Sequence, residues 1–477
     1  MVVDRRSPNS ILQGALNKAL SVLRDGAQGK NEDVFAEEFE SYWRRLENAT
    51  HIRSLIEATD QPRLIRRAET DDTGCLADSE EQISAFLNGS SVKGAFTIQK
   101  ALYVPLKKSA RVVPPRPDEP MWSDERIREV VWQNVAPVFE DKVRELCEEL
   151  SGQTTTVVLG VPKDTEGRSL VGVRYKGVET KHPLLSGVSS WKRVPLVLSR
   201  MDHGYIAPRS GADTELSSLN VLLVGGGAVG GHLSFELGRA GVGQITLVDP
   251  EKLRPENTYR HALGRSHWSD NKAKALKDRL ESKLPYLECQ AFPCKIQKAL
   301  NRGELDLRDY DLIVCATGDM TLELGLNEHV AGIEATPPLL HAWLEPYGIG
   351  GHVLVSGNEE AGCLECLFTS SSGKVRLHSR AAFAQEGQEF GRRLAGCGSP
   401  HTPYGSADAL HTAELATRLA TDVLTGRESG NPLRSWKGNP EEFLAEGYQL
   451  SNRFSLTSEQ LEKQKYAYVA GGCPVCG

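Results

Sequence analysis

A glycine-rich hexapeptide, Gly225 to Gly230, stands between an apolar run and a run with helical periodicity. Its GxGxxG spacing is typical of a turn at a helix N-terminus, where bare backbone approaches phosphate groups. Asp249 ends the next apolar run, where an acidic residue accepts hydrogen bonds from ribose hydroxyls. The pattern predicts a nucleotide in contact with Gly225, Gly227, Gly230 and Asp249. NAD and ATP both satisfy these residues, and a glycine-rich turn without a ligand is the alternative.

The residues that follow Asp249 favour ATP over NAD. A triphosphate needs donors and cations beyond its first phosphate, and Asn257, Arg260 and Lys272 supply them. Arginine binds phosphate oxygens through two hydrogen bonds, whereas lysine acts as a point charge. Asp319 follows a later apolar run, at the sheet edge where folds of this class bind ligands. A carboxylate there suits a Mg²⁺ ion that bridges the phosphates.

Four of the ten cysteines form two CxxC pairs, Cys363 with Cys366 and Cys473 with Cys476. Each pair brings two thiolates to one tetrahedral ion, so two pairs predict a closed zinc site of structural type. A redox-active CxxC is the competing interpretation. The remaining thiols include Cys289 and Cys315, which lie in apolar runs and are expected in the core.

Cys397 differs from the other cysteines because it lies among glycine, serine and proline residues, in LAGCGSPHTPYGS. We expect this segment to be exposed, between the first cysteine pair and a helix from Asp408 to Leu424. Arg392, Arg393 or the N-terminus of that helix would lower the pKa of the thiol and make it a nucleophile. The alternative is an incidental loop cysteine.

The elements that position these residues begin at Leu219, where apolar runs start to alternate with helical ones. This rhythm predicts βαβ units and a doubly wound, mostly parallel sheet. The expected strands and helices are Asn220–Val224, Ala228–Ala240, Gln244–Val248, Asn271–Leu284, Leu312–Ala316 and Leu339–Trp343.

The first 212 residues carry no chemical motif that we recognise. Helical periodicity, with apolar stripe Leu12, Leu16, Leu20 and Leu23, predicts helices packed on a neighbouring surface. Four prolines between Val112 and Met121 indicate a sub-boundary near residue 115. A strand pair is expected at Thr155–Val161 and Leu170–Tyr175.

The composition of the 477 residues, 39% hydrophobic and 25% charged, is that of an ordinary soluble protein. No apolar run reaches the length that spans a bilayer, and no secretory core follows Met1, so we expect a cytoplasmic protein that is not in a membrane. The net charge of −7 disfavours nucleic acid as a partner. Ten cysteines without a signal peptide indicate reduced thiols and no disulfide framework.

The series from the glycine loop to Asp319 resembles the ThiF/E1 superfamily of ubiquitin-like protein activating enzymes, over residues 213–477. The resemblance implies a Rossmann-like adenylation domain with a zinc knuckle, which uses ATP and Mg²⁺ to adenylate the C-terminal glycine of a ubiquitin-like protein. Arg260 and Lys272 would contact the phosphates, Asp319 would hold Mg²⁺, and Glu251 stands where the family often has a second aspartate. It also implies a homodimer.

Two further features follow from the same resemblance. A crossover loop, about 367–407, would carry the thioester cysteine, Cys397, whose acyl group passes to an E2. An arginine finger would come from upstream of the glycine loop, and Arg200 and Arg209 are the candidates.

The segments RHALG, WLEPYGIGGH and EEFESYW resemble the E1 parts of antiphage defence operons, of the cyclic-oligonucleotide and Bil types. That resemblance implies that residues 1–212 are a degenerate, inactive adenylation-like α/β region, and that the E2 is a separate chain or has been removed. His341 and His352 are expected to be structural. The alternatives are a sulfur-carrier adenylyltransferase without a thioester, an NAD-dependent oxidoreductase, and an adaptor without turnover.

Overall fold

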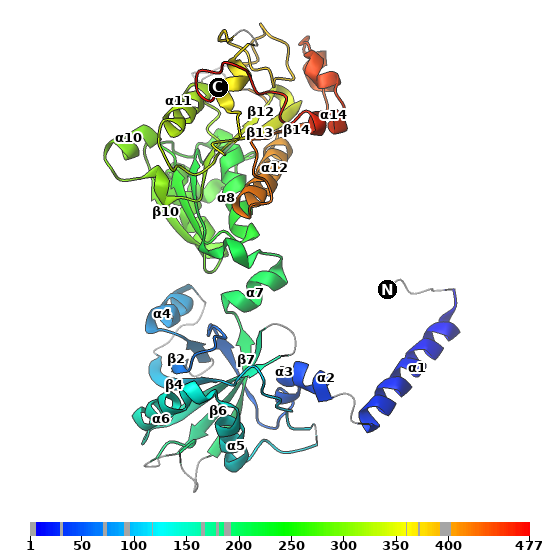
Figure 1. The fold of residues 1–477 in the computed structure, drawn as a ribbon, viewed down its shortest axis with the longest axis vertical. Helices are drawn as coiled ribbons and strands as arrows, with labels where there is room; N and C mark the ends of the chain where they lie inside the picture. The colour runs from blue at the N-terminus through cyan, green and yellow to red at the C-terminus, as the bar shows by residue number, and fades with distance from the viewer. Residues whose placement is uncertain are drawn as a thin grey trace. The chain divides into compact units, whose positions relative to one another are not determined.

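The computed structural model describes residues 6–28, 32–69, 74–89, 96–116, 118–163, 167–177, 181–185, 192–358, 360–370, 373–391 and 402–477. The chain divides into two compact units, Met1–Ile206 and Ala207–Gly477, which are drawn in Figure 1. The division falls inside helix α7 (His203–Ser210), close to the boundary expected after residue 212. Among the described residues, no helix is both long enough and apolar enough to cross a membrane.

Unit 1 is built on a seven-stranded sheet that closes into a barrel, in the order β1-β3-β2-β4-β5-β6-β7. The strands are β1 (Thr50–Ser54), β2 (Arg63–Glu69), β3 (Gly74–Ala77), β4 (Thr97–Pro105), β5 (Thr155–Pro162), β6 (Arg168–Lys176) and β7 (Lys192–Arg200). Strand β1 pairs in parallel with both β3 and β7, and β4 pairs in parallel with β5, whereas the other pairs are antiparallel. The closed, mixed sheet differs from an open doubly wound one, and the adenylation-like origin of this unit stays a prediction.

The helices of unit 1 are α1 (Pro8–Ala27), α2 (Glu32–Glu37), α3 (Phe39–Trp43), α4 (Glu80–Gly89), α5 (Asp124–Asn134) and α6 (Glu140–Glu149). Apolar side chains alternate along the strands, so that one set packs inside the barrel and the other packs under α5 and α6. The expected packing of the N-terminal helices is found for α3, whose Phe39 and Trp43 are buried against Trp122. The leucines of α1 are exposed. Strand β4 and helix α5, which flank residue 115, belong to the same unit.

Unit 2 contains the doubly wound sheet that the sequence predicts, in the order β10-β9-β8-β11-β12-β13-β14. Its strands are β8 (Asn220–Val224), β9 (Gln244–Val248), β10 (Glu288–Phe292), β11 (Leu312–Cys315), β12 (Leu339–Leu344), β13 (Gly350–Ser356) and β14 (Leu433–Lys437). The first five are parallel, and β13 and β14 extend the sheet in antiparallel fashion.

Helices cover both faces of this sheet: α8 (Ala228–Ala240), α9 (Lys272–Lys283), α10 (Ile296–Asn301), α11 (Met320–Ala331) and α12 (Ser406–Leu424). Val221 and Leu223 of β8 face α8, α9 and α12, whereas Leu222 and Val224 face α10 and α11. The smaller helices α13 (Glu441–Ala445) and α14 (Ser458–Lys463) follow β14. The expected doubly wound α/β class is therefore confirmed for this unit.

The order of the strands reverses at β8, because β9 lies on one side of it and β11 on the other. In open parallel sheets, the crevice at the carboxyl ends of the two strands beside such a reversal binds ligands. We therefore expect a ligand site at the turns that follow β8, β9 and β11.

Candidate functional site

The glycine loop follows β8 and requires glycine at two positions for steric reasons. Gly225 has a φ of +97°, and a Cβ there would lie 2.7 Å from the carbonyl oxygen of Ala316. A Cβ on Gly230 would lie 1.8 Å from the carbonyl oxygen of Gly225. Gly227, at the N-terminus of α8, is different: a Cβ there would meet no atom within 4 Å. Its backbone is open to an incoming ligand.

Asp249 lies directly after β9, with only 5% of its surface exposed. Its Oδ2 accepts a hydrogen bond from the N–H of Gly226 at 2.7 Å, and its Oδ1 accepts one from the N–H of Glu251 at 2.7 Å. Each carboxylate oxygen retains acceptor capacity for a ribose hydroxyl. Burial raises the pKa of this carboxyl above its ordinary value.

Two adjoining cavities open at the carboxyl edge of the sheet. The smaller, about 370 Å³, is lined by Gly225, Asp249 and Asp319 among others. The larger, about 530 Å³, is lined by Asn257 and Arg260 and extends to the β12 end of the sheet. The two share the lining residues Gly227, Glu251, Lys272 and Thr317. The structure thus brings the residues predicted to bind the nucleotide onto one continuous surface, with Gly230 packed beneath the loop.

An ion pair between a buried lysine and an exposed glutamate lies where the two cavities meet. Lys272 Nζ lies 2.6 Å from Glu251 Oε2, and the Lys272 side chain is largely buried. The hydrogen bond from Lys272 holds the pKa of Glu251 below its ordinary value. Lys272, which is expected to contact phosphate, is therefore paired with Glu251, the acid that is expected near the ribose.

Arg260 lies on the loop that follows Asn257, and its guanidinium carbon is 4.7 Å from the ring centroid of Tyr404. Asn257 shapes this loop, because its Oδ1 accepts a hydrogen bond from the N–H of Arg254 at 3.1 Å. Tyr404, just before α12, lines the larger cavity together with Arg260. Tyr404 was not predicted as a site residue, although it lies in the same glycine- and proline-rich segment as Cys397.

His261 ties the same loop to the glycine turn. Its Nδ1 accepts a hydrogen bond from the N–H of Leu263 at 3.0 Å, so the proton of the neutral ring is on Nε2, which donates to the carbonyl oxygen of Gly226 at 2.7 Å. Burial lowers the pKa of His261 to about 4. His261 was not predicted as a site residue, and its place directly after Arg260 is the only signal for it in the sequence.

Asp319 is the residue that precedes α11, and it caps that helix. Its Oδ1 accepts a hydrogen bond from the N–H of Leu322 at 3.1 Å. Its other carboxylate oxygen has no hydrogen bond from the described residues, and the side chain is exposed beside the smaller cavity. An oxygen of this kind, facing a space that also holds the glycine loop, fits a hard cation such as Mg²⁺.

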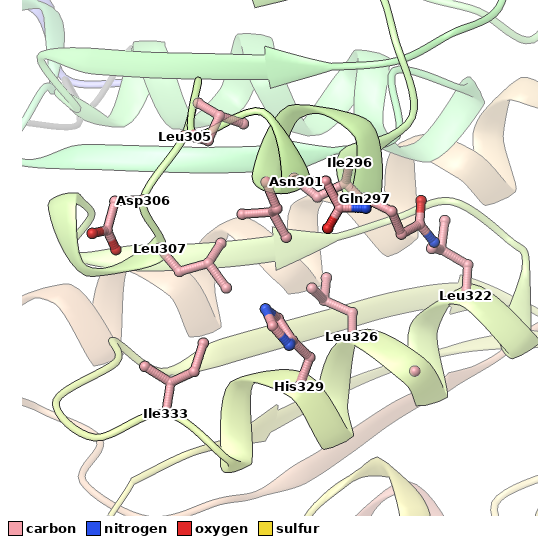
Figure 2. Close-up of a pocket in the computed structure, with 13 residues that line it drawn as sticks. Ile296, Gln297, Asn301, Leu305, Asp306, Leu307, Leu322, Leu326, His329 and Ile333 are labelled. Carbon is pink, nitrogen blue, oxygen red and sulfur yellow. The ribbon is translucent and has the colours of Figure 1, made fainter.

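A third cavity, about 580 Å³, continues from the smaller one between α10 and α11. It shares Ile296, Gln297 and Leu322 with that cavity. Figure 2 shows leucine and isoleucine side chains along it, with His329 reaching in from α11. The smaller cavity is thus extended by a groove whose walls are mostly apolar.

The four paired cysteines come together in unit 2. The Sγ atoms of Cys363 and Cys473 are 3.8 Å apart, and those of Cys366 and Cys476 are 3.3 Å apart. Sulfur atoms about 2.3 Å from one tetrahedral zinc ion would lie about 3.8 Å from one another. All four ligand atoms lie within 4.8 Å of each other, and three of the residues are buried. The donor set and its spacing therefore fit one zinc ion.

The remaining predicted residues have mixed outcomes. Cys397, Arg392 and Arg393 lie outside the described residues, so the role of Cys397 stays a prediction. Arg200 is held inside unit 1 by two contacts to Asp202, at 2.8 and 2.6 Å, which leaves it unsuited to act as a mobile finger. Arg209 is exposed on α7 and stays the candidate.

The predicted burial of Cys289 and Cys315 is confirmed, whereas the structural role of His341 and His352 stays a prediction. Cys289 and Cys315 are buried. His341 and His352 are buried as well, and each contacts a carboxylate, Glu323 at 3.2 Å and Glu345 at 3.0 Å. Glu323 was also missed, because a glutamate one turn into a helix has the pattern of a surface residue.

Comparison with known proteins adds independent findings. A sequence model described as the ThiF family matches residues 207–458. The ATP-dependent ubiquitin transferase-like protein Cap2 of Pseudomonas aeruginosa is 27% identical over 443 residues, which cover 89% of this chain and 77% of that protein. The sulfur carrier protein adenylyltransferase of Thermus thermophilus is 27% identical over 179 residues, which cover 36% of this chain and 64% of that protein. The crystal structure of E. coli MccB with ATP matches 55% of this chain and 68% of that chain, with 15% identity and a TM-score of 0.38.

Proposed function

Because this chain belongs to the ThiF family, we propose that it is an ATP-dependent adenylyltransferase that activates the C-terminal glycine of a ubiquitin-like protein. The family match, 207–458, contains the glycine loop, both nucleotide cavities and Asp319. The name of the Cap2 relative, which spans most of this chain, supports a ubiquitin-like substrate.

The observation that carries the proposal is the convergence at the carboxyl edge of the sheet. Asp249 and the glycine loop line the cavity on one side of Lys272, and Asn257 and Arg260 line the cavity on the other side. The first side suits an adenosine, and the second suits the outer phosphates and the incoming carboxylate. A dinucleotide would not require the cations of the second side, which is why we set aside an NAD-dependent oxidoreductase.

The reaction is a displacement at the α-phosphorus. A carboxylate oxygen of the ubiquitin-like protein forms a bond to phosphorus, the bond to the bridging oxygen breaks, and pyrophosphate leaves with that electron pair. Arg260 and Lys272 bind the departing phosphates and neutralise their charge, and the glycine loop orients the nucleotide. Asp319 would hold Mg²⁺, which supplies charge neutralisation between the phosphates when bound.

The steps after adenylation rest on Cys397. The thiolate of Cys397 would attack the acyl carbon, a thioester would form, and AMP would leave with the electron pair of the broken bond. The acyl group then passes to a separate E2-like protein. A second candidate function ends at the acyl adenylate, which a sulfur-transfer system consumes; similarity of the site region to the Thermus thermophilus sulfur carrier protein adenylyltransferase favours it.

Further parts of the proposal follow the family. The four cysteines hold a structural zinc ion, the protein is a homodimer, and Arg209 supplies the arginine finger. Unit 1 is an inactive adenylation-like region, and the setting is bacterial antiphage defence in the cytoplasm. The distances among the four sulfur atoms support the structural zinc ion, and the exposure of Arg209 supports its role as the arginine finger.

The test is ATP–pyrophosphate exchange by the full chain, with a small protein that ends in glycine as the acceptor. We expect exchange that depends on the acceptor and on Mg²⁺, and a fall of about 100-fold for Asp319→Asn, which keeps a helix cap but loses the charge. Tighter binding of NADH than of Mg-ATP, or full exchange by Asp319→Asn, would contradict the proposal.

The two candidate functions are separated by Cys397→Ala. If the protein forms a thioester, this variant retains ATP–pyrophosphate exchange and loses an adduct that dithiothreitol cleaves. If the wild-type protein exchanges pyrophosphate but never forms that adduct, the sulfur-carrier function is favoured.

A further inference from the structure

A buried glutamate lies directly behind the loop that presents Asp319. Glu323, on the first turn of α11, has no exposed surface. Its Oε1 accepts three hydrogen bonds: from the Thr317 N–H at 3.1 Å, the Thr317 hydroxyl at 2.8 Å and the Gly318 N–H at 3.2 Å. A buried carboxylate is stable only when donors surround it, and here all three belong to one short loop.

The same loop is tied to Asp319 by a further hydrogen bond. The N–H of Asp319 donates to the hydroxyl oxygen of Thr317 at 3.1 Å. Thr317 thus donates to Glu323 and accepts from Asp319. Gly318, between them, has a φ of +68°, a conformation that the hydrogen bond from its N–H to Glu323 helps to hold. The backbone that carries the Asp319 carboxylate is therefore fixed from inside the protein.

The other oxygen of Glu323 faces β12. His341 Nδ1 lies 3.2 Å from Glu323 Oε2, and both side chains are fully buried. His341 is also the register partner of Cys315, at the end of β11. The contact with His341 fixes Oε2 of Glu323 relative to the sheet. Oε1 in turn fixes the backbone of Thr317 and Gly318 through its hydrogen bonds.

We infer that Glu323 is a positioning residue, which holds the Thr317–Asp319 backbone so that Asp319 is preorganised for the metal–nucleotide complex. The inference rests on the proposed function, in which Asp319 holds Mg²⁺. Carboxylates behind a metal ligand act in this way in many sites, and their loss weakens metal binding although they never touch the ion.

A rival role for the same residues is a second metal site. Cys315, Glu323 and His341 each offer a ligand atom, all within 4.8 Å of one another. Oε1 of Glu323 is already engaged by three donors, and burial raises the pKa of the Cys315 thiol, which opposes the thiolate that a metal needs. The hydrogen-bonded arrangement is the one that the contacts favour.

The first experiment measures hydrogen exchange in the nucleotide-free protein. We expect the amides of Thr317 and Gly318 to exchange at least about tenfold faster in Glu323→Ala than in the wild type, because their acceptor is gone. Glu323→Gln keeps an acceptor oxygen of the same shape, and it should preserve most of the protection. Unchanged exchange in Glu323→Ala would overturn the inference.

The second experiment titrates Mg²⁺ at fixed ATP and follows binding by calorimetry. Glu323→Ala should raise the half-saturating Mg²⁺ concentration about 10-fold or more, whereas Glu323→Gln should stay within about threefold of the wild type. Thr317→Val removes the hydroxyl alone and should fall between them. A purely structural role predicts a lower melting temperature with unchanged Mg²⁺ dependence, and that result would overturn the inference.

The remaining outcomes are also decisive. If Glu323→Ala does not fold, Thr317→Val carries both measurements, and wild-type behaviour of that variant would count against the role. A second equivalent of zinc that is lost in His341→Ala would establish the rival metal site. If the wild type binds no Mg-ATP, the proposed function fails. The hydrogen-exchange experiment still tests whether Glu323 holds the backbone of Thr317 and Gly318.

Discussion

The guanidinium of Arg260 stacks on the ring of Tyr404, with 4.7 Å between the guanidinium carbon and the ring centroid. Arg260 belongs to the phosphate side of the cavity, and Tyr404 lies between Cys397 and helix α12 in the sequence. The contact therefore connects Arg260, which is proposed to act in adenylation, with the segment that carries Cys397, the proposed nucleophile of thioester formation.

We expect Tyr404→Ala to lower kcat/KM for ATP in the exchange assay by about two- to fivefold, since a cation–π contact contributes roughly 0.5 to 1 kcal/mol at a partly exposed site. Tyr404→Phe keeps the ring and should behave as the wild type. Equal kinetics for the alanine and phenylalanine variants would remove the stacking from the mechanism.

The ion pair between Lys272 and Glu251 predicts non-additive kinetics. Lys272→Ala removes a phosphate contact and also leaves the Glu251 carboxylate unpaired beside the phosphates, so a fall of about 100-fold in kcat/KM is expected. In a Glu251→Gln background the same change should cost only about tenfold, because the repelling charge is gone. Exchange rates of the four proteins form the cycle, and strict additivity would show that the pair does not matter to ATP.

Two glycines of the loop should respond to alanine in opposite ways. Gly227→Ala meets no protein atom within 4 Å, so the melting temperature should hold within about 2 °C, while the new methyl group blocks the phosphate path and ATP binding is lost. Gly230→Ala places a Cβ 1.8 Å from the carbonyl oxygen of Gly225 and should destabilise the fold by about 2 kcal/mol or more. Thermal melts with and without Mg-ATP distinguish the two effects.

The low pKa of His261 predicts a loss of stability in mild acid. The pKa is about 4 in the folded protein, whereas an unfolded chain has about 6.5. Between these two pH values, His261 is protonated in the unfolded state but neutral in the folded state. Its contribution to the free energy of unfolding is therefore fully present above pH 6.5 and is lost as the pH falls toward 4. From pH 7 to pH 5 the loss is about 2 kcal/mol.

His261→Gln is the matched variant for that prediction. Glutamine can donate to the Gly226 carbonyl and accept from the Leu263 N–H, and it does not titrate. Denaturant unfolding at pH 7 and pH 5 should therefore show a smaller decrease for this variant than for the wild type. An equal decrease in both proteins would assign the acid sensitivity to other groups.

The cysteine cluster predicts one zinc ion per chain, bound tightly enough to survive purification. Cys476→Ser should lose that ion and lower the melting temperature of unit 2 by several degrees. Cys294→Ser, which changes a thiol outside the cluster, is the control for metal content. Elemental analysis that finds no zinc in the wild type would leave the redox interpretation of the two CxxC pairs.

The sequence predicts unit 2 well because its signals are local. The expected bounds of β8, α8 and β9 match the structure, since each combines one apolar pattern with a glycine directly before or after it. Family membership, expected from the series that ends at Asp319, is confirmed by the ThiF match. The side chains of that series lie around adjoining cavities because the turns after β8, β9 and β11 meet at one edge.

The barrel of unit 1 was beyond sequence reasoning because its closure depends on distant pairing. Strand β1 is held by β7, almost 150 residues later, and β2 interleaves Arg63, Arg66 and Glu69 with apolar residues. Glu323 could not be found for a related reason. Its burial arises only when α11 docks on β12 and the loop turns its donors inward.

The two cysteine pairs are 110 residues apart along the chain, and a bound ion would fasten both ends of that span to one point. The intervening stretch would then be a ring closed by metal, so a protease that cuts it once would open the ring without releasing a fragment. A chelator added after the cut would remove the ion, and the C-terminal piece would then separate more easily.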